Sequence, residues 1–97
     1  MNKALRDMIH DISALGIEHL VMNVDFEYDA GFINLREVSF KKTFANDRQY
    51  AFTVTVALDL YEIKCVPLYR GISDVRQVKH PDEVLAAVEE MINEKAN

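Results

Sequence analysis

The middle of the chain alternates apolar and polar residues with a period of two, a pattern typical of strands with one buried face. Residues 22–28 place Met, Val, Phe and Tyr between Asn, Asp and Glu. The apolar set resumes at Ile33 and Leu35, and the longest alternation runs from Tyr50 to Leu60. This pattern predicts an antiparallel meander of three strands over residues 20–60.

The first predicted turn is Ala30-Gly31, because glycine tolerates the positive φ that a tight turn demands. A two-residue loop there sets Phe26 opposite Leu35 and Asp25 opposite Arg36. That facing acid–base pair would help to fix the register of the first two strands.

The second predicted turn is Asn46 to Arg48, since Asn and Asp tolerate left-handed backbone geometry. A three-residue loop there sets Phe44 opposite Tyr50 and Phe40 opposite Val54.

The apolar parity changes within the second strand, where Val38 and Phe40 are out of phase with Ile33 and Leu35. One extra residue near Arg36-Glu37, a β-bulge, would return Val38 and Phe40 to the buried face. The alternative is a twisted sheet with both faces partly covered.

Two segments with helical spacing of apolar residues flank the meander. The first predicts a helix over residues 3–15 that stops at Gly16. The second starts at His80-Pro81, where proline suits the first helical position, and ends near Lys95.

Residues 61–69 leave two interpretations open, a bent continuation of the third strand or a fourth strand. Val75 to Val78 is expected to be a short extended piece. The predicted fold is α+β, one domain spanning residues 1–97. It has an N-terminal helix, a three- to four-stranded antiparallel meander and a C-terminal helix, with both helices on one sheet face.

Composition and charge narrow the function classes. The formal net charge of −5 argues against direct nucleic-acid binding, which needs a basic surface. Cys65 is the only cysteine, which fits a reducing compartment. We see no signal peptide, and no apolar run approaches the roughly 18 residues of a membrane helix. We therefore expect a cytoplasmic protein that does not act at a membrane.

Acidic residues concentrate in the first strand, with four acids and no Lys or Arg from Glu18 to Asp29. A run of carboxylates two residues apart suits a divalent cation, a solvated face or an acidic contact stripe. We prefer the contact stripe, because hard-cation sites usually draw their ligands from loops. An aromatic–arginine pair beside Gly71 has the composition of a binding hot spot. The predicted partner-binding residues are Asp25, Glu27, Asp29, Glu18, Tyr69 and Arg70.

Catalytic and cofactor motifs are not evident. Cys65 lies in an apolar strand and is expected to be a buried, inert thiol. His10, His19 and His80 are scattered without metal-ligand spacing, and the three glycines form no phosphate-binding loop. We expect no enzyme activity, no metal and no cofactor.

The sequence therefore favours a small, acidic, non-enzymatic protein-binding module. We expect an inhibitor that occupies a basic surface of another protein, including a surface that ordinarily binds nucleic acid, as phage anti-defence and toxin-immunity proteins do. One alternative is a small divalent-metal-binding enzyme that uses the carboxylates of the first strand. The other is a homo-oligomeric structural subunit or adaptor, such as a homodimer, that pairs through Val21, Thr53, Thr55, Ala57 and Tyr61.

Overall fold

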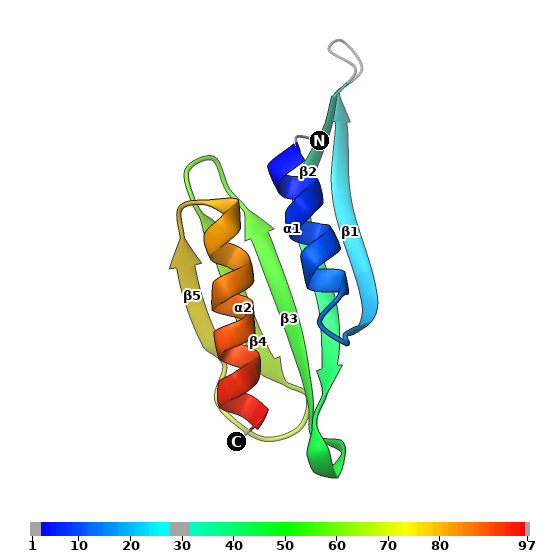
Figure 1. Cartoon of the computed structure of the whole chain (residues 1–97), viewed down its shortest axis with the longest axis vertical. Helices are drawn as coiled ribbons and strands as arrows, with labels where there is room; N and C mark the ends of the chain where they lie inside the picture. The colour runs from blue at the N-terminus through cyan, green and yellow to red at the C-terminus, as the bar shows by residue number, and fades with distance from the viewer. Residues whose placement is uncertain (1–2, 28–31, 97) are drawn as a thin grey trace.

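The computed structural model describes residues 3–27 and 32–96. Its strands form one antiparallel five-stranded sheet in the order β1-β2-β3-β4-β5, and two helices lie on the same face of that sheet (Figure 1). The predicted α+β class with a helix at each end is confirmed. The elements are α1 (Lys3–Ser13), β1 (Glu18–Glu27), β2 (Phe32–Thr43), a 3₁₀ turn η1 (Ala45–Asp47), β3 (Gln49–Val56), β4 (Tyr61–Pro67), β5 (Asp74–Val78) and α2 (Pro81–Ala96).

The predicted count of three to four strands is wrong, because the chain after Leu60 supplies two more strands. The N–H of Ala57 donates to the carbonyl of Leu60 at 3.0 Å, and this turn separates β3 from β4. Residues 61–69 therefore begin a fourth strand rather than continue the third. The short extended piece expected at Val75 to Val78 is part of β5. Asp74 and Arg76 take the positions of this strand that face the helices, so it lacks the apolar alternation that would have assigned it to the sheet.

The β-bulge predicted at Arg36-Glu37 is present in β2. Val24 of β1 pairs with Leu35, while the residue before Val24 pairs with Glu37, so Arg36 is the extra residue. As a result Leu35 and Val38 are both buried on the helix-bearing face.

The register between β1 and β2 differs from the prediction. Asp25 and Phe26 pair with Asn34 and Ile33, each two residues before the predicted partner. The last described pair joins the residue after Phe26 to the residue before Ile33, so the connection is longer than a two-residue loop. The predicted turn at Ala30-Gly31 lies outside the described residues.

The register between β2 and β3 is also shifted by two residues, since Phe40 pairs with Phe52 rather than Val54. The connection is longer than the predicted three residues and is closed by a hydrogen bond from the N–H of Phe44 to the carbonyl of Arg48 at 2.7 Å. Two residues within it have φ of 63° and 57°, the left-handed geometry expected of Asn and Asp.

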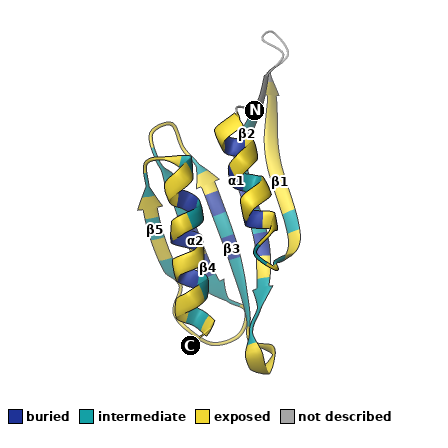
Figure 2. Cartoon of the chain, in the orientation of Figure 1, coloured by how far each residue is buried: buried dark blue, intermediate teal, exposed yellow. Residues whose placement is uncertain are grey.

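A hydrophobic core fills the space between the sheet and the two helices (Figure 2). At its centre the rings of Phe40 and Phe52 stack with centroids 5.0 Å apart. None of the described side chains of the two edge strands, β1 and β5, is fully buried. Among the side chains that the structure describes, the buried ones are Leu5, Met8, Ile12, Leu35, Val38, Phe40, Phe52, Val54, Ile63, Cys65, Val84, Ala87, Val88 and Met91.

The helix boundaries follow the signals in the sequence. After α1 the chain turns at Gly16, whose φ is +66°. The ammonium of Lys42 donates to the carbonyls of Leu15 at 3.0 Å and Gly16 at 2.9 Å, and so satisfies carbonyls just beyond the helix end. Pro81 is the first residue of α2, as predicted. Neither α1 nor α2, as described, has the length and apolarity that a membrane span requires.

Candidate functional site

Of the acidic stripe predicted on β1, the structure describes one side chain, that of Asp25. The carboxylate of Asp25 accepts a hydrogen bond from Nε of Arg36 at 2.5 Å, and both side chains are 58% exposed. This ion pair joins the two residues that were expected to face each other, although they meet diagonally across the bulge. The side chain of Glu27 and the whole of Asp29 lie outside the described residues. The charge of Asp25 is therefore compensated locally.

The other predicted contact residues lie in separate parts of the molecule. Glu18 begins β1 and pairs with Lys41 across the sheet. Tyr69 and Arg70 are exposed in the connection between β4 and β5. Strands β2 and β3 lie between β1 and β4, so three strand spacings, about 14 Å, separate the first strand from the fourth. The structure does not join Glu18 to the Tyr69-Arg70 pair in one patch.

The residue set proposed for self-association is also divided. Val21, Thr53 and Thr55 lie on the sheet face away from the helices, where their partners include Ser39. Tyr61 packs against the hydrophobic core on the opposite face, and Ala57 lies in the turn after β3. The five residues therefore do not share one face of the sheet.

The expectation that Cys65 is buried is confirmed. Cys65 is free and fully buried, and burial raises its pKa to about 11. Lys95 and Arg76 act in the opposite direction but do not offset the loss of hydration. Near neutral pH the thiolate needed for nucleophilic chemistry is therefore scarce.

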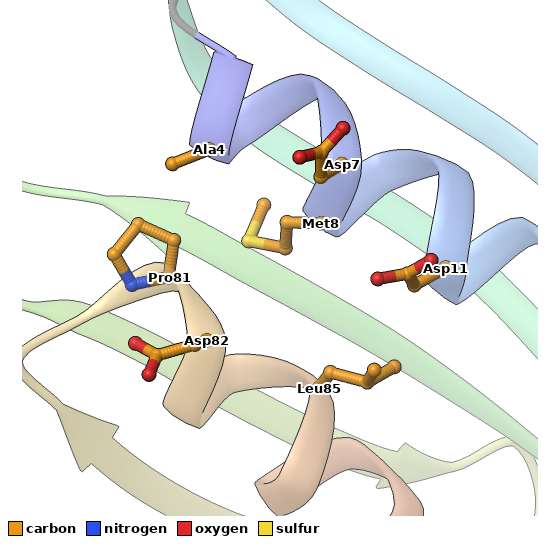
Figure 3. A pocket seen from close by; sticks show the side chains of 7 residues that line it. All are labelled: Ala4, Asp7, Met8, Asp11, Pro81, Asp82 and Leu85. Atoms are coloured by element: carbon orange, nitrogen blue, oxygen red, sulfur yellow. The ribbon is translucent and has the colours of Figure 1, made fainter.

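A groove lies between the two helices (Figure 3). It encloses about 340 Å³. Met8 and Leu85 form an apolar floor where α1 and α2 meet, and Met8 is only 3% exposed. Carboxylates rim this floor from both helices, so the groove combines apolar contact with negative charge. Its lining residues are Ala4, Asp7, Met8, Asp11, Pro81, Asp82 and Leu85.

The two carboxylates on α1 are placed against the local preferences of a helix. Asp7 and Asp11 are four residues apart, so they are neighbours on one face, and like charges at this spacing are destabilising. Asp11 also lies in the last turn, where the helix dipole disfavours negative charge. Within residues 3–27 and 32–96, neither residue is in an ion pair. Lys3 is four residues before Asp7 and offsets part of this repulsion, so the local conflict is greatest at Asp11.

The acids of α2 divide into those that hold the fold and those that remain available. Arg76 of β5 donates to Glu94 at 2.6 Å, and its other terminal nitrogen lies 3.3 Å from Glu90. The hydrogen bond that Arg76 donates to the carboxylate of Glu94 is the main cause that raises the pKa of Arg76. Asp82, in the first turn of α2, forms no ion pair with another described residue. Its carboxylate completes the rim of the groove.

The groove matches the chemistry of a lysine or arginine side chain. The methylene stem of such a side chain packs on apolar residues while its charged end stays with polar groups. Met8 and Leu85 would contact the stem, and the carboxylates of Asp7 and Asp11 on α1 and of Asp82 on α2 line the same groove. In the described part of the chain, no group of three His, Cys, Asp or Glu residues is arranged to hold a metal ion.

The groove is not evident from the sequence, because it forms only when α1 and α2 lie side by side. One signal was present, the like-charged pair Asp7 and Asp11 on one helix face.

Comparison of the chain with protein-family models, with curated proteins and with solved structures finds no match.

Proposed function

We propose that this chain is a non-enzymatic protein-binding module that inhibits a partner by occupying a basic part of its surface. A lysine or arginine side chain of the partner enters the groove between α1 and α2. The observation that carries this proposal is the apolar floor of Met8 and Leu85, rimmed by three carboxylates without ion pairs among the described residues.

Electrostatics supports both the encounter and the docked state. The net charge of −5 attracts a basic partner over a distance and raises the association rate at low ionic strength. On docking, a cation in the groove would relieve the repulsion between Asp7 and Asp11. A surface that ordinarily binds nucleic acid is one basic surface of this kind, and the single reduced cysteine favours the cytoplasm as the place of action.

The residues predicted from the sequence remain candidates for a second contact. Tyr69 is 83% exposed beside Arg70, a composition found at binding hot spots. Asp25 is compensated by Arg36 and therefore offers less free charge than the groove.

The test is partner capture from the native host with two variants of equal charge. The groove variant carries Asp7→Asn, Asp11→Asn and Asp82→Asn. The control variant carries Asp47→Asn, Asp59→Asn and Glu89→Gln, three exposed acids outside the groove. Each variant raises the net charge by three, so a general loss of attraction affects both equally.

We expect the wild type and the control variant to retain one partner that the groove variant loses. The binding constant of that purified partner should fall at least tenfold for the groove variant alone. If the groove variant binds normally while Asp25→Lys, Glu27→Lys and Asp29→Lys together abolish binding, the contact is the strand and not the groove. An equal loss of partner binding in the groove and control variants would show that the interaction depends only on net charge.

A further inference from the structure

Strand β1 is a long edge strand. It contains ten residues, from Glu18 to Glu27, and pairs with β2 on one side only in the sheet order. The opposite edge strand, β5, has five residues and is tied to α2 through Arg76. A long edge presents a row of backbone N–H and C=O groups that can pair with another strand.

The helix-bearing face of β1 carries a row of partly exposed apolar side chains. Met22, Val24 and Phe26 are 48%, 46% and 52% exposed. Met22 and Val24 pair with buried Val38 and Leu35, so they lie on the same sheet face as the core. The core therefore continues on to β1 but is only half covered there, as Figure 2 shows by the exposed colour of this strand.

This edge has little of the protection that usually prevents strand pairing. Charged residues, proline and bulges are the common devices. Between Leu20 and Phe26 the only charged residue is Asp25, and its charge is compensated by Arg36. The irregularity at His19, with φ of 55°, lies at the start of the strand, and the second register shift, at Asn23 and Val24, has its extra residue in β2 rather than in β1.

We propose that a second copy of this chain pairs with β1, antiparallel, about a two-fold axis at Val24. This arrangement joins two five-stranded sheets into one continuous sheet of ten strands. Val24 then faces Val24 of the second copy, and Met22 faces Phe26 of the second copy. On the other sheet face, Asn23 faces Asp25 of the second copy and supplies a hydrogen-bond donor to a carboxylate.

Charge favours this register over its neighbour. A two-fold axis at Asp25 would set two carboxylates directly opposite each other, which is destabilising. The axis at Val24 keeps like charges apart and sets apolar residues against apolar residues on the helix-bearing face.

The helices leave room for this pairing. Figure 1 shows α1 in front of β2, one strand in from the edge. The β2 strands of the two copies would be three strand spacings apart, about 14 Å. Packed helices approach to about 8–10 Å, so the two α1 helices would not collide. Both interhelical grooves would then face the same side of the dimer.

Disulfide cross-linking tests the register. In Val24→Cys, the two introduced thiols would lie across one antiparallel pair, with Cα atoms about 4.5–5.5 Å apart, within disulfide reach. In the control Val21→Cys, the same register separates the two copies of residue 21 by six residues, about 20 Å. Cys65 is buried in both variants and should not react.

We expect Val24→Cys to form a covalent dimer under mild oxidation at least tenfold faster than Val21→Cys. In sedimentation equilibrium, the wild type should approach twice the chain mass of 11.1 kDa as its concentration rises. Val24→Lys should remain a monomer with an unchanged circular dichroism spectrum, because two lysines would meet at the axis. A wild type that is monomeric at every concentration, or equal cross-linking of the two cysteine variants, would overturn the proposal. Because Val24 is outside the groove, failure here leaves the proposed groove contact standing.

Discussion

At the scale of single residues, Cys65 links stability to pH. Burial raises its pKa from 9.0 to about 11, so between these values the unfolded chain loses the thiol proton while the folded chain keeps it. The folded state then binds more protons, and the free energy of unfolding falls as pH rises, by about 2–3 kcal/mol in total. Below pH 9 this contribution is fully present.

Urea unfolding of the wild type and Cys65→Ala at pH 8, 9, 10 and 11 measures this effect. The alanine variant is expected to be less stable at pH 8, since it leaves a cavity, but to lose less stability as the pH rises. Parallel curves for the two proteins would show that the thiol does not control the alkaline loss.

Lys42 is a second residue whose role the structure defines. Its ammonium binds two carbonyls at the end of α1, so Lys42→Met should cost about 1–2 kcal/mol of unfolding free energy while the aliphatic stem is kept. Lys41→Met is the matched control, because Lys41 is exposed on the opposite sheet face and should change stability by less than about 0.5 kcal/mol. Equal effects in chemical denaturation would contradict the assigned role of Lys42.

At the scale of elements, the groove carboxylates affect their helices in opposite directions. Asp11 lies in the last turn of α1 and Asp82 in the first turn of α2. Asp11→Asn should therefore stabilise the protein by about 0.3–1 kcal/mol, and Asp82→Asn should destabilise it by a similar amount. Both should weaken partner binding. Denaturation midpoints that move in the same direction for the two variants would contradict this account.

The attachment of α2 to the sheet depends on Arg76. Arg76→Gln removes the contacts to Glu90 and Glu94 and leaves two like charges four residues apart, so we expect a loss of about 1 kcal/mol. Because these carboxylates are partly exposed, the loss should shrink in 1 M salt. Arg70→Gln, in an exposed loop, is the control. An equal loss of unfolding free energy in both variants would contradict the assigned role of Arg76.

At the scale of the whole molecule, the sequence predicted what depends on local pattern. The two helices follow from apolar spacing, and the bulge follows from the change of parity between Leu35 and Val38. The strand registers could not be predicted in the same way, because they depend on the lengths of the connections. Asn, Asp and Gly indicate that a turn is present but do not fix its length, and both registers differ from the prediction by two residues. Strand β5 was predicted only as a short extended piece at Val75 to Val78 and not as part of the sheet, because Arg76 holds a helix-facing position through ion pairs instead of apolar packing.

The groove could not be predicted from the sequence, because its parts are distant along the chain. Asp7 and Asp11 are separated from Asp82 along the chain by all five strands, and they line one groove because α1 and α2 lie side by side. The acidic residues of β1 drew attention by their density, yet Asp25 is compensated by Arg36, a partner that follows in β2. In this chain, carboxylates without an ion-pair partner therefore indicate the candidate binding site better than a high local density of acidic residues does.

The central claim is that the groove binds a basic side chain, and amide NMR shifts test it most directly. The ¹⁵N-labelled protein would be titrated with a short peptide that contains arginine, and with the same peptide containing neutral citrulline. We predict saturable shifts at Met8 and Leu85 with the arginine peptide alone, and no such shifts when Asp7, Asp11 and Asp82 are all changed to Asn. Equal shifts with the citrulline peptide, or shifts confined to the β1 residues around Asp25, would contradict the claim.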